Sequence, residues 1–403
     1  MAFFKKEELK LLWPFYLYYL VIPMFIFMPA FLVVYFKHIG LNLFQIGLLS
    51  SMGMLSTLIF EIPTGAFADL YGRKLSMLLG QFIIGISYLS VFFIREFSIL
   101  LIAFSFIGIG GTFTSGAEEA WFTDLIKHKN KKFLHGYFIK SNSISSFGMV
   151  VSGILGAFLV KVFGVSIIWI AAGFSFLLSL LILVFAQEHF KRKKVRIRDS
   201  FKDVIRHSIK SFNYSRKHHV LLYFLIASIF LTIAGSFNSD FAWITLLQQL
   251  NFPDYAFGYM WSALGFVGIF APLVSTKLMK KGKERQFILV VIILEILVLS
   301  LIYTATTVLL VLAALLAYYF FFFMRLPMQR VYFHKFIPNK LRATVGSIES
   351  MLSSLIMIII IPIVGSFIDH FGPRISLFMA GLLMIPAVVV YYLIDESKVK
   401  EKL

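Results

Sequence analysis

Long apolar runs separated by short polar links make up most of the 403-residue chain. The segment "SIIWIAAGFSFLLSLLILVFA", residues 166–186, has no polar face. The outer helices of a water-soluble protein need such a face at helical periodicity. A run of about 20 apolar residues is long enough to cross a bilayer as one helix. The pattern therefore predicts membrane-spanning helices rather than a soluble globular protein.

Twelve apolar runs can be separated by their polar breaks. Each is expected to form one transmembrane helix, and several are longer than the minimum, which allows the helix to tilt. The predicted fold class is an all-α membrane protein with twelve transmembrane helices. The expected spans are residues 12–36, 43–68, 75–94, 98–124, 137–160, 165–187, 219–249, 255–278, 286–304, 308–333, 342–367 and 374–394.

Basic residues gather on one side of the expected spans. Of the 38 Lys and Arg, 31 fall in the termini and the links of one side, and only four fall in the links of the other. Because Lys- and Arg-rich loops stay in the cytoplasm, both termini are expected there, in a multi-pass protein of the cell (plasma or inner) membrane. The same distribution accounts for most of the net charge of +18 without a nucleic-acid partner.

The longest polar stretch divides the spans six and six. Residues 188–218 are expected to form a basic cytoplasmic linker, either as a helix lying on anionic lipids of the inner leaflet or as a plain solvated link. The predicted domains are six-helix bundles over 1–187 and 219–403. "GAFLVKVFG" (156–164) echoes "GSFIDHFG" (365–372) at the same place in each half. This echo indicates a parallel repeat and hence two pseudo-symmetric bundles.

The link between the second and third spans reads "EIPTGAFADLYGRK", residues 61–74. It resembles the signature loop of the major facilitator superfamily: glycine, three residues, aspartate, basic, any residue, glycine, arginine, basic. Leu70 stands where the family has its first basic residue. The resemblance implies a transporter whose two six-helix bundles give alternating access to a central cavity. The matching residues are Gly65, Asp69, Gly72, Arg73 and Lys74.

The residue types of this loop suit their places. Gly65 permits close helix packing, and Gly72 can adopt the positive φ of a tight turn. Asp69 can accept hydrogen bonds at a helix N-terminus, where the helix dipole favours an anion. The resemblance implies that Asp69 and Arg73 latch the two halves together on the cytoplasmic side, against the start of span 11 near Arg342.

Charged residues inside spans are candidates for proton coupling, because a charge at mid-bilayer costs at least about 2.5–3.5 kcal/mol. Glu118 and Glu119 lie in span 4, and about 100° separates them around a helix, so at most one points fully into a central cavity. The repeat places Glu118 opposite Arg325 in span 10. We therefore predict that one of the two glutamates faces Arg325 and that its protonation frees the arginine. A permanent bridge that only holds helices together is the alternative.

Polar and aromatic positions in the spans are candidates for lining a substrate cavity. Asp240 ends the polar run "GSFNSD" (235–240) in span 7 and is expected to contact substrate or a proton, or else to lie at a hydrated helix end. Aromatic rings in spans 1 and 10 could stack on a large, apolar or cationic substrate. The candidates for this cavity are Tyr19, Asn238, Asp240 and Phe321.

Further charged residues are expected near the latch. Glu61 precedes the signature loop by one turn and Glu349 lies about two turns into span 11, so both are candidates for a network with Arg330 or Arg342. Glu295 lies in span 9, which faces lipid in the superfamily. It is as well explained by protonation or by a local partner as by a function.

These features favour a secondary active transporter over an enzyme. The chain lacks cysteine, a clustered nucleophile or metal set, and the phosphate-binding G-x-x-x-x-G-K loop. We expect no metal or cofactor, a proton gradient as the energy source, a small-molecule substrate and a monomer. "FEIPTGAFADLYGRK" with "SGAEEAWFTD" (115–124) resembles bacterial and archaeal efflux members, which implies proton-coupled export of amphipathic molecules or drugs. A proton-coupled uptake symporter or a lipid-linked flippase is the alternative, and Phe104 stands where many drug–proton antiporters carry arginine.

Overall fold

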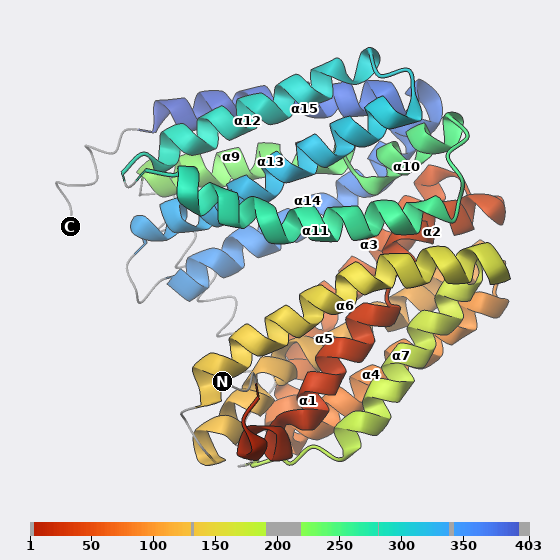
Figure 1. The fold of residues 1–403 in the computed structure, drawn as a ribbon, viewed down its shortest axis with the longest axis vertical. Coiled ribbons are helices and arrows are strands. Elements are labelled where there is room, and N and C mark those ends of the chain that lie inside the picture. Colours follow the sequence, from red (N-terminus) through yellow and green to blue (C-terminus); the bar gives the residue numbers. More distant parts are fainter. Residues whose placement is uncertain (1–3, 130–132, 191–218, 281, 338–341, 395–403) are drawn as a thin grey trace. The chain divides into compact units, whose positions relative to one another are not determined.

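The computed structural model describes the chain except for residues 1–3, 130–132, 191–218, 281, 338–341 and 395–403. Every regular element of the described residues is helical (Figure 1). The expected linker helix falls on residues 191–218 and therefore lies outside the described part. The helices are α1 (Lys6–Phe25), α2 (Met28–His38), α3 (Leu43–Tyr71), α4 (Arg73–Phe93), α5 (Phe97–Lys129), α6 (Leu134–Phe163), α7 (Ile167–Val184), α9 (His219–Phe237), α10 (Asp240–Gln249), α11 (Ala256–Leu278), α12 (Glu284–Ser300), the short 3₁₀ turn η2 (Leu301–Tyr303), α13 (Val308–Lys335), α14 (Arg342–Phe371) and α15 (Pro373–Leu393).

Twelve segments of the described chain are long and apolar enough to cross a membrane, which confirms the predicted all-α class and the number of spans. Several helices extend past the apolar runs, whereas α7 falls short of the expected 165–187. The first begins at Lys6 rather than residue 12, and the tenth ends at Lys335 rather than residue 333. Charged end turns continue the helical backbone after the apolar pattern has stopped, so hydropathy alone sets the limits too short.

The chain forms two compact units. Each contains most of one half of the spans, and the start of α3 and the start of α11 are grouped with the opposite half. The predicted domain limits, at residues 187 and 219, stay a prediction. Unit 1 comprises residues 1–41, 48–201 and 254–262, and unit 2 comprises residues 42–47, 202–253 and 263–403.

The first span of each half is interrupted. α1 ends at Phe25 and α2 begins at Met28, while α9 ends at Phe237 and α10 begins at Asp240. In the first span Pro29 lies in the first turn of α2, where a proline with its fixed φ starts a helix without losing a hydrogen bond. The sequence analysis treated both spans as continuous helices, and in this respect it was wrong.

Two side-chain hydrogen bonds lie at the second interruption, and the first of them pairs a backbone carbonyl. Ser376 Oγ donates to the carbonyl oxygen of Phe237 at 2.8 Å, and Trp243 Nε1 donates to Asn238 Oδ1 at 3.0 Å. Backbone groups freed inside a membrane need such partners, because lipid offers none. Interrupted helices at corresponding places of two repeats mark the binding region in many transporters, so both breaks direct attention to the nearby side chains.

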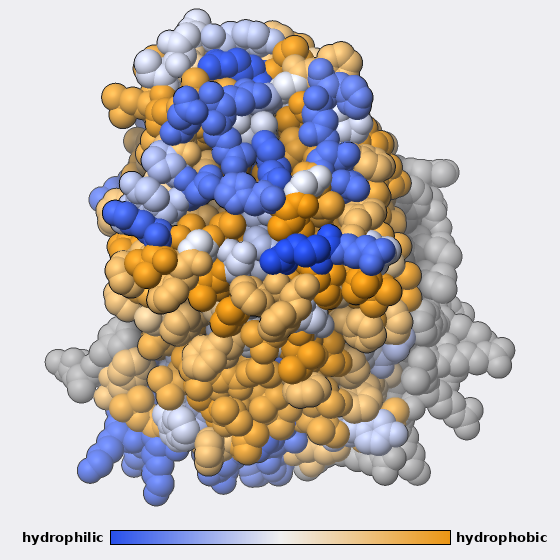
Figure 2. Space-filling model, turned by 90° about the vertical axis from the view of Figure 1, so that its right-hand side faces the viewer, coloured by the Kyte–Doolittle hydropathy of each residue, from blue (hydrophilic) through white to orange (hydrophobic). Residues whose placement is uncertain are grey.

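The outer surface exposes many large apolar side chains, more than a water-soluble protein would. Phe93, Phe185 and Leu309 have exposed fractions of 79%, 70% and 76%. Figure 2 shows hydrophobic side chains over much of the face in view, with hydrophilic side chains gathered in patches. Exposed apolar surface of this extent needs lipid around it, which agrees with the membrane spans.

Glycines bring the helices around α5 into close contact. A Cβ placed on Gly108 would collide with the backbone of Gly53 in α3, and one on Gly110 would meet Ile84 and the carbonyl of Gly80 in α4. Small residues allow helix backbones in a membrane to approach in this way. α5 is therefore held firmly between α3 and α4, which fixes the place of the glutamates further along it.

Candidate functional site

The signature loop lies at the end of unit 1 where α1 begins and α5 ends. We call this the basic end because Lys6, Lys127 and Lys129 lie there. Gly72 joins α3 to α4 with a φ of 106°. Only glycine adopts such a backbone without steric cost. The predicted tight turn at Gly72 is confirmed.

A carboxylate from beyond the end of α7 caps the N-terminus of α4. Glu188 Oε1 accepts hydrogen bonds from the backbone N–H groups of Arg73, at 2.7 Å, and Lys74, at 3.0 Å. The helix dipole favours an anion at this place. The expectation that Asp69 accepts hydrogen bonds at a helix N-terminus stays a prediction, and at α4 Glu188 accepts two of them. Glu188 lies more than a hundred residues further along the chain, so no local motif could have indicated it.

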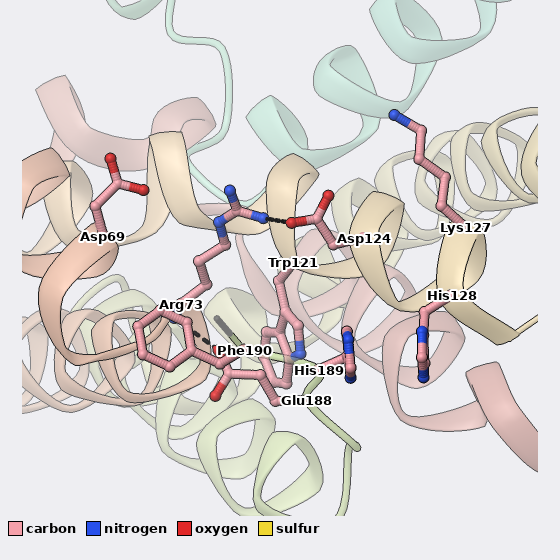
Figure 3. Close-up of a pocket in the computed structure, with 9 residues that line it drawn as sticks. All are labelled: Asp69, Arg73, Trp121, Asp124, Lys127, His128, Glu188, His189 and Phe190. Atoms are coloured by element: carbon pink, nitrogen blue, oxygen red, sulfur yellow. Dashed lines mark hydrogen bonds and ion pairs between the residues drawn. The ribbon is translucent and has the colours of Figure 1, made fainter. Parts of the chain in front are cut away.

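The two basic residues of the loop bind within unit 1. Lys74 Nζ donates to the carbonyl oxygens of Val184, at 2.6 Å, and Ala186, at 2.8 Å. These carbonyls end α7, where the helix dipole favours a cation. Arg73 forms an ion pair with Asp124 near the end of α5 (Figure 3). The loop thus ties α4 to α5 and α7.

Asp69 and Arg73 line one cavity of about 330 Å³, together with Asp124 (Figure 3). The latch across the two halves stays a prediction, and the side chain of Arg342 lies outside the described part of the chain. The expectation that Gly65 permits close helix packing stays a prediction: among the described residues, a Cβ on Gly65 would meet no heavy atom within 4 Å.

Glu118 and Glu119 differ in exposure, as expected of adjacent residues on a helix. Glu118 is half-buried, and its carboxylate accepts hydrogen bonds from the hydroxyls of Tyr18, at 2.9 Å, and Tyr19. Glu119 is exposed. The expectation that the two cannot share one face is confirmed. The contact joins α5 to α1.

Aromatic rings surround the Glu118 carboxylate. The ring centroid of Tyr19 lies 5.2 Å from that of Tyr18 and 6.3 Å from those of Phe122 and Tyr137. Among the described residues, the hydrogen bonds of Glu118 come from neutral hydroxyls and no basic side chain forms an ion pair with it. Within the described residues, hydroxyl dipoles are therefore what this carboxylate is bound by.

Arg325 has partners within unit 2 that the sequence analysis did not assign to it. In the described part of the chain its guanidinium bonds Glu295 through Nε, at 2.7 Å, and Nη2, at 3.1 Å, and Gln329 through Nη1, at 2.8 Å. The predicted approach of Glu118 or Glu119 to Arg325 would join the two units and stays a prediction. Both members of the pair are buried, Arg325 with 4% and Glu295 with 0% of its surface exposed. A buried guanidinium needs an adjacent carboxylate, and α12 packs along α13 within unit 2. The pairing gives Glu295 the local partner that the sequence left open.

A second buried ion pair lies in unit 1. Glu8 in the first turn of α1 accepts from Lys140 Nζ in α6, at 2.6 and 2.7 Å, and from the Tyr16 hydroxyl, at 2.6 Å. Glu8 is only 2% exposed. Lys140 lies within the expected span 137–160. Lys140 was itself the available signal, because a lysine at that depth needs an acidic partner.

The candidates for a substrate cavity in unit 2 have different surroundings. Asp240, at the start of α10, is half-buried and accepts a long hydrogen bond of 3.4 Å from the Tyr319 hydroxyl. Asn238 is buried, and its amide oxygen is occupied by Trp243. Phe321 is half-buried, with its ring 5.8 Å from that of Phe320. Asp240 and Tyr319 are therefore better placed than Asn238 to meet a ligand.

Three of the remaining latch candidates have side chains that the structure describes. Glu61 and Arg330 are exposed, and Glu349 is half-buried and accepts from Ser228 Oγ at 3.1 Å. No group of three His, Asp or Glu in the described residues is arranged to hold a metal ion.

A polytopic all-helical protein with twelve spans, interrupted first helices in both halves and a charged signature loop belongs to the class of membrane transporters. A sequence model described as Major Facilitator Superfamily matches residues 16–356. The chain belongs to this superfamily and is a secondary transporter.

Relatives and solved structures agree with this assignment. The chain is 22% identical over 388 residues to YxaM of Bacillus subtilis, an uncharacterized MFS-type transporter, with 94% of each chain covered. The crystal structure of the nucleoside transporter NupG matches with a TM-score of 0.72 at 12% identity, covering 95% of this chain and 99% of that one. A D-xylose-proton symporter matches with a TM-score of 0.69 at 15% identity, covering 96% of each chain. These solved structures share the fold.

Proposed function

We propose that the protein is a proton-coupled secondary transporter of the cell membrane that exports amphipathic small molecules, with Glu118 as the residue that binds the proton. The basic end faces the cytoplasm, in keeping with the positive-inside rule. The protein works as a monomer, and the proton gradient supplies the energy without a bound cofactor.

The surroundings of Glu118 carry this proposal. An ionised carboxylate can accept from both tyrosine hydroxyls, but a protonated one carries its own O–H donor and has less acceptor capacity. Proton uptake therefore changes the hydrogen bonds between α1 and α5 without breaking an ion pair. A group whose bonding between helices depends on its charge can shift the balance between two conformations.

Aromatic and polar side chains in each unit support an amphipathic substrate. Tyr19 and Phe122 in unit 1 and Tyr319 and Phe321 in unit 2 offer faces on which an apolar or cationic group can stack. Asp240 adds a carboxylate at an interrupted helix, where transporters commonly bind their substrates. We propose that Asp240 contacts the substrate.

The signature loop is the proposed latch between the two halves. Asp69 and Arg73 latch the two halves on the cytoplasmic side, with Glu61, Arg330, Arg342 and Glu349 as candidates for the surrounding network. The direction of transport rests on the likeness of the loop and of residues 115–124 to efflux members. Uptake is the competing direction, and the test below distinguishes the two.

Transport into proteoliposomes under an imposed pH gradient tests the proposal. Dyes, drugs, nucleosides, sugars and amino acids are screened in both gradient directions, and an uncoupler must abolish accumulation. Glu118→Gln is expected to abolish gradient-driven transport, whereas the matched change of its exposed neighbour, Glu119→Gln, is expected to leave it intact. Gradient-driven transport that survives Glu118→Gln contradicts the role of Glu118, and accumulation in the same direction as proton flow contradicts export by antiport.

A further inference from the structure

A groove runs between α1 and α6 in unit 1, and none of the roles proposed for transport uses it. Its volume is about 510 Å³. Figure 1 shows α1 lying between α6 and α7 in this unit. Apart from Ser143, the side chains that line the groove are apolar or aromatic: Phe4, Leu9, Trp13, Tyr16, Leu17, Leu20, Ile144 and Phe147.

Side chains on both walls of the groove are open to the surroundings. On α1 the exposed fractions of Leu9, Trp13 and Leu17 are 40%, 38% and 39%, and on α6 that of Phe147 is 64%. The described residues therefore leave the groove uncovered. Exposed apolar surface of this kind marks a place where a membrane or another apolar partner binds.

The buried ion pair of unit 1 fixes the inner wall of the groove. The Tyr16 hydroxyl donates to Glu8, and Lys140 on α6 donates to the same carboxylate. Lys140 Nζ lies 5.3 Å from the centre of the Phe4 ring, and that ring lies 5.0 Å from the ring of Tyr16. These contacts hold α1 and α6 in place before any ligand arrives, which lowers the cost of binding.

Two lysines lie at the end of the groove that is nearest the basic end. Lys6 and Lys10 precede Trp13 by seven and three residues, spacings that put all three on one side of α1. Both lysines are exposed, and the ion pairs found among the described residues include neither of them. Glu7, the exposed acid of this turn, lies about 120° round the helix from Trp13. The mouth of the groove is therefore positively charged.

The length of the groove matches one leaflet of a bilayer. From Lys10 to Leu20 the helix rises about 15 Å, at about 1.5 Å per residue. The hydrocarbon core of a bilayer is about 30 Å thick, so one leaflet takes about half of it. An acyl chain lying along the groove thus places the phosphate of its headgroup beside the two lysines. A basic cluster at this level attracts anionic lipids rather than zwitterionic ones.

We propose that the groove binds one anionic phospholipid of the leaflet at the basic end. Its acyl chain lies against Trp13, Leu17 and Phe147, and its phosphate lies at Lys6 and Lys10. The bound lipid bridges α1 and α6 from outside, on the opposite side of the groove wall from the buried ion pair. This inference goes beyond the proposed function and does not depend on the substrate or on the direction of transport.

Quenching of Trp13 fluorescence by brominated phospholipids measures occupancy of the groove in the full-length protein. The protein is reconstituted in phosphatidylcholine vesicles with a rising fraction of brominated phosphatidylglycerol or brominated phosphatidylcholine. The Trp13 signal is the fluorescence that is lost in Trp13→Phe. The expected affinity for phosphatidylglycerol relative to phosphatidylcholine is about 25-fold, since a lysine near the membrane surface contributes about fivefold.

Three variants test the lysines and the groove separately. Lys6→Gln with Lys10→Gln is expected to bring the relative affinity close to one. Lys127→Gln with Lys129→Gln is the matched control, because it removes the same charge at the same end but from the last turn of α5, and it is expected to keep the preference. Ser143→Phe puts a ring into the groove from α6 and is expected to remove the preference although both lysines remain.

Several outcomes overturn the proposal. Equal quenching by the two lipids in the unchanged protein leaves the groove to bulk lipid. Equal losses in the Lys127 and Lys129 control and in the Lys6 and Lys10 variant assign the preference to the overall surface charge. An unchanged preference in Ser143→Phe places the lipid outside the groove, and no quenching of Trp13 by either lipid shows that another part of the protein covers it. Transport by Glu118→Gln is measured separately, so the proposed function stands or fails whichever result the lipids give.

Discussion

Glu118 in unit 1 and Glu295 in unit 2 are both acids within spans, but they are stabilised in opposite ways. Glu295 is fully buried and receives two charged hydrogen bonds from Arg325. Glu118 is half-buried and receives its bonds from two tyrosine hydroxyls. A carboxylate paired with a buried guanidinium cannot take up a proton without leaving that cation uncompensated.

The two acids therefore differ in what their hydrogen bonds hold together. Arg325 and Glu295 hold α12 against α13 through a buried ion pair, whereas Glu118 joins α5 to α1 through tyrosine hydroxyls. Under the function proposed above, a proton on Glu118 changes these hydrogen bonds without breaking an ion pair, which a proton on Glu295 would do.

Glu295→Gln is expected to cause the largest loss of stability among the variants considered. It leaves the Arg325 guanidinium buried without a counter-charge, and the free energy of unfolding is expected to fall by about 3–5 kcal/mol. Chemical denaturation in mixed micelles measures the change. Replacing both members, Glu295→Leu with Arg325→Met, is expected to cost less than the single change, because no lone charge remains.

The matched control is Glu118→Gln, which keeps the shape of the side chain and can still accept from a tyrosine. Its cost in stability is expected to stay below about 1 kcal/mol, the net worth of one neutral hydrogen bond. Equal losses for the two glutamine variants would show that hydroxyls and a guanidinium stabilise these carboxylates alike.

Some of these features could be predicted from the sequence because they depend on local pattern. The spans follow from apolar length, and the turn at Gly72 follows from the spacing of the signature loop. The interruption at Asn238 was visible as a polar run, but a run of polar residues does not say whether the helix continues through it. Pro29 likewise follows an apolar stretch that hydropathy treats as continuous.

Pairing of charges could not be predicted, because it depends on which helices are neighbours. The internal repeat placed Arg325 opposite Glu118, but a repeat relates equivalent positions and does not identify contacts. Glu295 lies on the helix packed beside Arg325 and meets it there. Glu188 is distant in the sequence from the helix that it caps, so its role required the packing of α7 against α4.

Glu8→Gln applies the same test to the buried ion pair of unit 1, Glu8 with Lys140. It leaves the Lys140 ammonium without its carboxylate, and the free energy of unfolding is expected to fall by about 2–3 kcal/mol. The cost is smaller than for Glu295→Gln because the Lys140 side chain is 16% exposed and its flexible stem can carry the charge towards water. Thermal unfolding in detergent measures the change. Glu7→Gln, at an exposed acid of the same helical turn, is the control and is expected to have no effect.

Glu188 is a carboxylate whose hydrogen-bond donors are backbone N–H groups rather than side chains, and its replacement shows how much such donors contribute. Glu188→Ala removes the acceptor for the N–H groups of Arg73 and Lys74, and the start of α4 is expected to lose about 1 kcal/mol, the worth of a helix cap. Hydrogen exchange at these two amides should then be about fivefold faster. Glu188→Gln keeps a carbonyl acceptor and is expected to show a smaller increase, and Gln187→Ala none, because Gln187 takes part through its backbone carbonyl. Equal exchange in Glu188→Ala and the unchanged protein would show that the cap does not hold the signature loop, and would leave the side chains of Arg73 and Lys74 to position that loop through their bonds to α5 and to the end of α7.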